Sequence, residues 1–291
     1  MKGDVVAATD AATPTHEELS IGGRAVMVHR AGAGNDRALV FLHGGGPGAS
    51  GWSNWQHALP ALASRYDCIA PDFIGFGQSE HPDPAPGDPR AWNRLRIDMV
   101  VGLLDELGIE RASLIGNSLG GAISLHLMME APERFERAVL MGTAGGPSSH
   151  APRQEVIKMV SFYADPSPEA LARLYSWFVY DVDQFNGDLG EIARDRFEQT
   201  MRPEVRRSYE AMFAGPLMLA LPESALRRIR QPILLVHGSD DSVNPLEDSV
   251  YFLRTLPNAG LHVFPRCGHW TQLEYPEKFH NLLDQFFSDE L

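Results

Sequence analysis

The sequence predicts an α/β fold, a mostly parallel twisted sheet flanked by helices, with an all-helical lid insertion. Strand-length apolar runs alternate with helix-like stretches between Ala38 and Met141, as in repeated βαβ units. Residues 148–228 then contain helix-like stretches without a convincing strand, and the sheet pattern resumes after them. We therefore expect a core formed by residues 15–147 and 229–291, covered by a helical lid formed by residues 148–228.

The first half of the core is expected to begin with a hairpin. Strands at 18–21 and 25–29 flank Gly22 and Gly23, which suit a two-residue turn. Residues 38–42 form a continuous apolar run, as in a strand that is buried on both faces. The elements expected after it alternate: a helix at 55–63, a strand at 68–70, a helix at 92–107 closed by Gly108, a strand at 112–115, a helix at 122–130 and a strand at 138–141.

The lid and the second half of the core follow from the same patterns. Four helix-like, aromatic-rich stretches predict lid helices at 153–163, 168–179, 189–201 and 203–213. An alternative is a helical face that only packs on the core. The core then resumes with a strand at 232–237, a helix at 250–256, a strand at 260–264 and a closing helix at 276–287.

Composition excludes several classes of partner. The 291-residue chain is 44% hydrophobic and 22% charged, which is typical of a globular protein, and it is long enough for a sizeable core. Its formal net charge of -13 would repel nucleic acid and anionic membrane surfaces, so we expect neither as a partner. An anionic substrate would therefore need local arginine residues to hold it.

Targeting signals are not evident. Residues 1–14 are small, polar and rich in alanine and threonine, so we expect a disordered N-terminus without the apolar core of a signal peptide. No run approaches 18 apolar residues, so we expect no membrane span. Cys68 and Cys267 are too few for a disulfide framework, which suits a cytoplasmic protein. We interpret Cys267, two residues before a histidine of interest, as a small buried side chain.

Ser118 is the candidate nucleophile. The apolar run 112–115 leads into Gly116-Asn117-Ser118-Leu119-Gly120, and a helix-like stretch follows at once. This is the G-x-S-x-G pattern between a strand and a helix, where a strained turn exposes the serine at the carboxyl end of the sheet. The helix N-terminus beneath it would stabilise nearby negative charge. By itself the pattern also fits an ordinary turn, so partners elsewhere must decide.

Those partners occur in the order that such a serine requires. A base must lie within hydrogen-bonding reach and an acid must orient it, and on this type of sheet the order is serine, acid, histidine. His269 lies in a glycine-preceded loop after the last strand and is the candidate base. Asp240 and Asp241 both follow the preceding strand. We favour Asp241, four residues before Pro245, because one of the two aspartates would cap a turn.

An oxyanion hole would complete the machinery. The backbone N–H of Leu119, directly after the nucleophile, is one expected donor. The other is expected from the loop that begins His43-Gly44-Gly45-Gly46, with Gly45 as the donor, because glycine lets the backbone approach a substrate closely. Four features in this order predict a serine hydrolase.

With these residues assembled, the chain resembles the α/β-hydrolase superfamily over essentially its whole length. Within it the chain is similar to the meta-cleavage product hydrolases. The resemblance depends on residues 42–54 (LHGGGPGASGWSN), 116–121 (GNSLGG) and 261–270 (LHVFPRCGHW). Asparagine before the nucleophile and tryptophan after the histidine are more particular than a generic triad. Leucine follows Ser118 where methionine also occurs in such enzymes, but only its backbone N–H is required.

The resemblance implies hydrolysis of a carbon–carbon bond in 2-hydroxy-6-oxo-hexa-2,4-dienoates, the ring-opened products of catechol derivatives. It implies no cofactor and no metal, a small anionic dienoate as partner, and a homo-oligomer of two or more chains. It also implies that Asn54, Asn117, Arg196 and Trp270 contact the substrate. The alternatives are an amide that fixes a loop for the two asparagines, a packed aromatic for Trp270 and a solvated helix residue for Arg196. A guanidinium suits a 2-oxo acid because it can bind it bidentately. Arg194 is a near neighbour of Arg196 and stays an alternative.

Three questions stay open at this point. An ester or lactone hydrolase could use the same triad, and a ligand receptor could reuse the fold without turnover. The C6 substituent of the substrate is not evident either. The aromatic lid residues indicate a bulky or aryl group, or packing alone: Phe162, Tyr163, Trp177, Phe178 and Tyr180.

Overall fold

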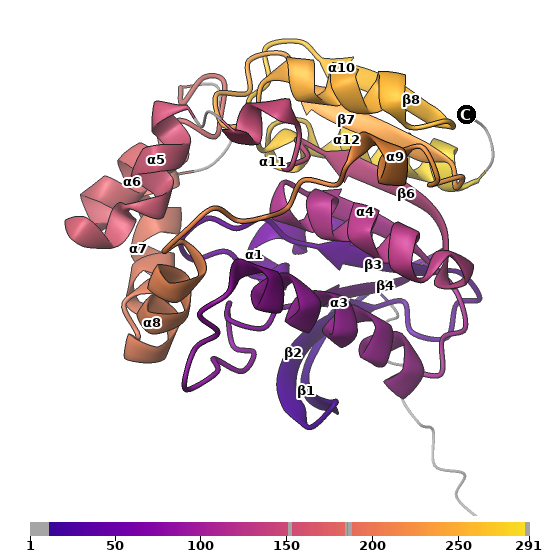
Figure 1. Ribbon diagram of the computed structural model, residues 1–291, viewed down its shortest axis with the longest axis horizontal. Helices are drawn as coiled ribbons and strands as arrows, with labels where there is room; N and C mark the ends of the chain where they lie inside the picture. The colour runs from indigo at the N-terminus through magenta and orange to yellow at the C-terminus, as the bar shows by residue number, and fades with distance from the viewer. Residues whose placement is uncertain (1–11, 151–152, 184, 186–187, 289–291) are drawn as a thin grey trace, which may run out of the picture.

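An eight-stranded sheet forms the centre of the molecule (Figure 1) in a computed structural model that describes residues 12–150, 153–183, 185 and 188–288. The strand order is β1-β2-β4-β3-β5-β6-β7-β8. Strands β1 and β2, and β2 and β4, pair antiparallel, and all other pairs are parallel. The strands are β1 (Thr15–Ile21), β2 (Arg24–Ala31), β3 (Ala38–Leu42), β4 (Asp67–Pro71), β5 (Ala112–Asn117), β6 (Phe135–Met141), β7 (Ile233–Gly238) and β8 (Ala259–Phe264).

Helices cover both faces of this sheet, which confirms the predicted fold class. The helices that flank the sheet are α1 (Gly51–Trp55), α2 (Ala58–Leu62), α3 (Pro89–Glu106), α4 (Leu119–Glu130), α9 (Glu223–Leu226), α10 (Leu246–Thr255), α11 (Thr271–Glu274) and α12 (Pro276–Phe287). Short 3₁₀ helices span Pro132–Arg134, Pro147–His150 and Phe162–Ala164. Most of the N-terminal segment expected to be disordered, residues 1–11, lies outside the described residues.

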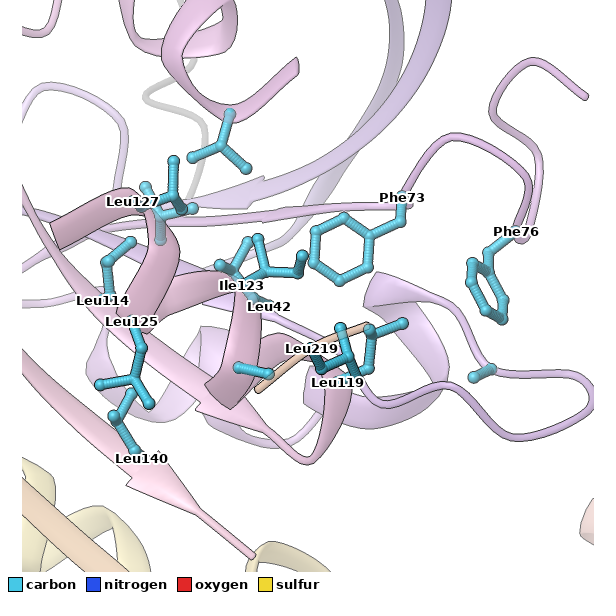
Figure 2. Packing of buried hydrophobic residues seen from close by; sticks show 14 of the residues in the cluster. Leu42, Phe73, Phe76, Leu114, Leu119, Ile123, Leu125, Leu127, Leu140 and Leu219 are labelled. Carbon is cyan, nitrogen blue, oxygen red and sulfur yellow. The ribbon is translucent and has the colours of Figure 1, made fainter. Parts of the chain in front are cut away.

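The central strands are buried on both faces, as their continuous apolar runs predicted. Successive residues of a strand point to opposite faces, so one strand supplies two hydrophobic layers. Leu42, Leu114 and Leu140 of three adjacent strands pack with Ile123 of α4 in the layer shown in Figure 2. The residues next to them in sequence belong to the opposite layer, with α2 and α12: Phe41, Ile115 and Met141. Because each such side chain stabilises the fold by roughly 1.5–3 kcal/mol, the strand ends are held rigidly.

The prediction of one helix over residues 55–63 was wrong. The structure has two short helices there, α1 and α2, separated at Gln56 and His57. Pro60 explains the break, because a proline inside a helix has no N–H to donate and clashes with the carbonyl four residues earlier, here that of Gln56. Helix α10 also begins at Leu246, four residues before the predicted start, and the short helices α9 and α11 were not predicted.

The lid helices lie between β6 and β7 in the chain and form a group beside the sheet, at the left of Figure 1. They are α5 (Gln154–Val160), α6 (Pro168–Ser176), α7 (Leu189–Thr200) and α8 (Pro203–Met212). Ser167 caps α6 by accepting a hydrogen bond from Ala170 N, and Asp188 caps α7 through the N–H groups of its first turn. The division of the chain at residues 148 and 228 stays a prediction.

Candidate active site

Ser118 occupies the sharp turn between β5 and α4, in a backbone conformation that side chains rarely adopt. Its φ is 52° and its ψ is -108°. Glycine is required on both sides of it: a Cβ on Gly116 would lie 2.6 Å from Gly120 backbone atoms, and one on Gly120 would lie 2.1 Å from the carbonyl oxygen of Leu42. The Ser118 N–H is held by the carbonyl of Met141 at 2.9 Å. The close approach of strand and helix therefore maintains the strained turn.

Asp241 and His269 meet at the carboxyl ends of β7 and β8. His269 Nδ1 lies 2.7 Å from Asp241 Oδ2, and both side chains are buried. The other carboxylate oxygen accepts the N–H groups of Val243 at 2.8 Å and Asn244 at 3.0 Å. Burial opposes ionisation of this carboxyl, but the charge and hydrogen bond of His269 outweigh it, so the pKa of Asp241 is lowered. Asp240 is exposed and accepts the Ser239 hydroxyl.

Gly142, directly after β6, makes room for this pair. Its φ is 50°, and a Cβ there would lie 2.9 Å from His269 Nδ1 and 3.1 Å from Asp241 Oδ2. Ser118 and His269 line the same pocket, although their side chains are not hydrogen-bonded to each other in the part of the chain that is described. Such contacts often close only when a substrate binds.

The Gly-rich loop after β3 is organised by His43. Its Nε2 accepts the Phe73 N–H at 2.9 Å and its Nδ1 donates to the Gly44 carbonyl at 2.7 Å. Accepting and donating at once requires a neutral ring, and burial lowers the pKa of His43 to about 4. Gly45 then lies next to Leu119: a Cβ on Gly45 would be 3.3 Å from the leucine side chain. The Leu119 N–H belongs to the first turn of α4, whose donors have no partner within the helix.

The four expected substrate-contacting residues all line the pocket at Ser118. The Asn54 side-chain oxygen accepts the Gly44 N–H at 3.3 Å, and Asn117 Nδ2 donates to the Met141 carbonyl at 3.4 Å. Trp270 is 6% exposed and packs edge-on against Phe178. The pocket thus combines amide groups with an aromatic wall.

Arg196 reaches this pocket from α7. Its guanidinium donates to the Ser53 carbonyl at 2.9 Å and lies over the rings of Tyr175 and Trp270, 5.4 Å and 5.7 Å from their centroids. Arg194, its neighbour in the same helix, is exposed and lies 4.0 Å from Asp188. Only one of the two arginines is therefore placed to meet a ligand at Ser118.

Some pocket residues were not predicted from the sequence. Tyr175 lines the pocket, and its hydroxyl donates to the Pro47 carbonyl at 2.8 Å. Met159 lines it from α5. Of the five lid aromatics singled out in the sequence, only Phe178 lines this pocket; Tyr180 is 40% exposed. The helical period could have revealed Tyr175, since it lies three residues before Phe178.

The lid backbone is joined to the histidine loop. The Phe178 carbonyl accepts the N–H of His269 at 2.7 Å and of Trp270 at 3.0 Å. Glu274 accepts the N–H of Gly268 and of Tyr180, both at 2.7 Å. Cys267 is buried beside them, and burial raises the pKa of its thiol, which keeps it protonated.

Among residues 12–150, 153–183, 185 and 188–288, no cluster of three or more His, Cys, Asp or Glu side chains could hold a metal ion. Within the same ranges, no helix has the length and apolar character needed to cross a membrane.

Known proteins resemble this chain along nearly its full length. Residues 39–282 match the alpha/beta hydrolase family. A 2-hydroxymuconate semialdehyde hydrolase of Pseudomonas sp. (strain CF600) is 38% identical, over 94% of this chain and 93% of that protein. The solved structure of a 2-hydroxy-6-oxo-6-phenylhexa-2,4-dienoate hydrolase from Rhodococcus sp. strain RHA1 has a TM-score of 0.90 at 40% identity, covering 95% of this chain and 99% of that chain.

A second solved structure agrees with the first. It is a serine hydrolase from the polyaromatic hydrocarbon-degrading bacterium Cycloclasticus zankles, with a TM-score of 0.91 at 40% identity over 96% of this chain and 99% of that chain. The matches therefore cover the core and the lid alike. This chain belongs to the α/β hydrolase family and, within it, to the meta-cleavage product hydrolases.

Proposed function

We propose that this enzyme hydrolyses the C5–C6 bond of 2-hydroxy-6-oxo-hexa-2,4-dienoates, giving a carboxylic acid and 2-hydroxypentadienoate. The observation that carries the proposal is that Ser118, His269 and Arg196 line one pocket. The first two supply a nucleophile and a base, and the third supplies a cation for the substrate's carboxylate and enol oxygen. The relatives support the same class of substrate, since one is named for a semialdehyde and the other for a 6-phenyl dienoate.

In the proposed mechanism, the dienol is first converted to a ketone, with His269 carrying the proton to C5. This step makes C5 a viable leaving group, because the electrons of the C5–C6 bond can then enter a conjugated enolate. Ser118, deprotonated by His269, attacks the C6 ketone. The N–H groups of Gly45 and Leu119 stabilise the oxyanion, the C5–C6 bond breaks, and water releases the acid. No cofactor takes part in these steps.

The test follows the loss of the yellow dienolate absorbance with alkyl-, phenyl- and fused-ring-substituted substrates. We expect turnover of at least one of them, and none by Ser118→Ala. Consumption of simple esters or lactones with no dienoate turnover would instead identify an ester or lactone hydrolase. Binding without multiple turnover would identify a receptor.

Arg196 and Arg194 form a matched pair for this test. Arg196→Ala removes a charged hydrogen-bond donor from the pocket, so we expect kcat/KM for the dienoate to fall by roughly 10- to 100-fold. Ester hydrolysis should fall far less, because an ester has no enol carboxylate to bind. Arg194→Ala, on the exposed face of the same helix, should stay within about twofold on both substrates. Equal losses from the two variants would contradict the assignment of Arg196.

We also propose that the enzyme works in the cytoplasm as a homo-oligomer of two or more chains. The two free, buried cysteines support a reducing compartment, and the family resemblance supports the oligomer. Light scattering should then give a mass that is a multiple of 32.1 kDa. A monomer mass at enzyme concentrations used for assay would contradict this.

A further inference from the structure

A second histidine faces the acid of the candidate triad. His237 is the penultimate residue of β7, and its side chain is fully buried. Its Nε2 atom lies 3.5 Å from Asp241 Oδ2, the oxygen that also binds His269. The two histidines therefore approach the same carboxylate oxygen, His237 from β7 and His269 from the loop after β8.

The hydrogen bonds of His237 determine where its proton lies. Nε2 is 3.0 Å from the carbonyl oxygen of Asn244, which can only accept, so Nε2 carries the hydrogen. Nδ1 is 2.7 Å from the Ser249 hydroxyl of α10, which donates to it. Burial also lowers the pKa of His237, so the ring is neutral. The Nε2–H is donated to Asn244, and Asp241 Oδ2, 3.5 Å from Nε2, lies near the partial positive charge of this N–H without a hydrogen bond to it.

The same bonds connect His237 to the loop that shapes Asp241. Asn244 receives the His237 proton at its carbonyl, while its own N–H donates to Asp241 Oδ1 at 3.0 Å. Asn244 Nδ2 also donates to the Gly142 carbonyl at 2.7 Å. His237, Asn244 and Asp241 therefore connect β7 with the loop after it, and Ser249 connects His237 to α10.

We propose that His237 is a positioning residue that acts through Asp241: the partial positive charge of its Nε2–H offsets part of the carboxylate's charge. The inference rests on the proposed roles of Asp241 and His269. Other charged or titratable groups that interact with Asp241 or His237 are Arg153, which donates to the Asp241 carbonyl at 2.9 Å, Asp248, Cys267 and Glu274. In the part of the chain that is described, none of these four forms an ion pair or hydrogen bond with Asp241 Oδ2, which lies 2.7 Å from His269 Nδ1 and 3.5 Å from His237 Nε2.

The test compares His237→Asn with His237→Gln. Glutamine can place an N–H near the position of Nε2, whereas asparagine ends near Nδ1 and leaves no N–H beside Asp241 Oδ2. Without the partial positive charge of that N–H, Asp241 would stabilise the His269 imidazolium more strongly. We expect the acid limb of the kcat/KM pH profile to move up by about 0.5–1 pH unit in His237→Asn and to return toward the wild-type position in His237→Gln.

Controls separate this role from a loss of stability. His126 is also largely buried and donates to a backbone carbonyl, that of Leu219, but lies about two helical turns along α4 from Ser118. His126→Asn should lower stability without moving the limb. The pH at the midpoint of the acid limb does not depend on the fraction of the enzyme that is folded. An unchanged or lowered limb in His237→Asn, or an equal shift in His126→Asn, would overturn the proposal.

The profile is measured with an aryl ester as well as the dienoate. Failure of the C–C hydrolase proposal would appear as no dienoate turnover, while the ester profile still reports on His237. If His237→Asn does not fold, ¹⁵N-histidine NMR of the wild-type enzyme decides. We expect neutral His237 with its proton on Nε2 throughout the active pH range. An imidazolium would place a full positive charge beside Asp241, and an Nδ1–H form would remove the Nε2–H; either result would overturn the inference.

Discussion

Replacing Asp241 by asparagine tests the site most directly, because the change alters hydrogen-bond chemistry with almost no change in shape. In the wild-type protein, Oδ1 accepts two backbone N–H groups and Oδ2 accepts His269 Nδ1 at 2.7 Å. Since the two backbone donors require an oxygen, the new amide would turn its oxygen toward them. Its NH₂ group would then face His269 Nδ1.

That geometry forces the wrong tautomer on His269. Facing an NH₂ donor, Nδ1 must become an acceptor, so the imidazole proton moves to Nε2, the atom that would take the proton of Ser118. The same substitution in a serine protease triad costs roughly 10⁴-fold in kcat, and we expect a similar loss here, which corresponds to about 5 kcal/mol of transition-state stabilisation. Binding of the dienoate should change little, because Asp241 does not line the pocket.

Asp240→Asn is the matched control. Asp240 is exposed and its carboxylate contacts only the adjacent Ser239 hydroxyl among the described residues, so we expect turnover within about twofold of wild type. The assay is steady-state loss of dienolate absorbance, with circular dichroism to show that both variants fold. If Asp241→Asn stays within tenfold of wild type, or Asp240→Asn loses as much, the choice between the two aspartates is wrong.

Two further predictions concern stability. In urea titrations, the free energy of unfolding of Ser118→Gly should be about 1 kcal/mol higher than that of Ser118→Ala. Glycine removes the Cβ strain at φ 52°, and both variants lack the nucleophile. Equal free energies of unfolding would refute strain at this turn. In the unfolded chain His43 binds a proton below its usual pKa of 6.5, whereas burial in the folded protein lowers this pKa to about 4. The free energy of unfolding should therefore fall as the pH drops from 6.5 toward 4. By pH 5.5 His43 alone should cost about 1 kcal/mol, and flat stability from pH 7 to 5.5 would contradict its burial as a neutral ring.

The strands were predictable because burial on both faces leaves a clear pattern. A strand such as β3 must be apolar at every position, and the run from Ala38 to Leu42 has the same bounds in the structure. Short helices leave a weaker pattern. Helix α11 has one turn and its stability comes from tertiary contacts, so neither its propensity nor its period could indicate it.

The choice of Ser118, Asp241 and His269 was possible because strand ends of a parallel sheet share one edge, so motif order implies spatial proximity. The side-chain contacts between these strand ends could not be predicted from the order of the motifs. Gly142 ends an ordinary apolar strand, and its importance appears only when the His269 and Asp241 side chains lie against it. His237 likewise looks like the last polar residue of a strand until Asn244 and Ser249 determine its proton.

Residues of the lid and of the core contact one another around Ser118. The Phe178 carbonyl binds the backbone of His269 and Trp270, and the ring of Trp270 packs on Tyr175 and the guanidinium of Arg196. A displacement of α6 and the segment after it would therefore move Arg196 and the backbone of His269 together. If Arg196 binds the dienoate and His269 is the base, as proposed, substrate binding would also favour the His269 position needed for attack by Ser118.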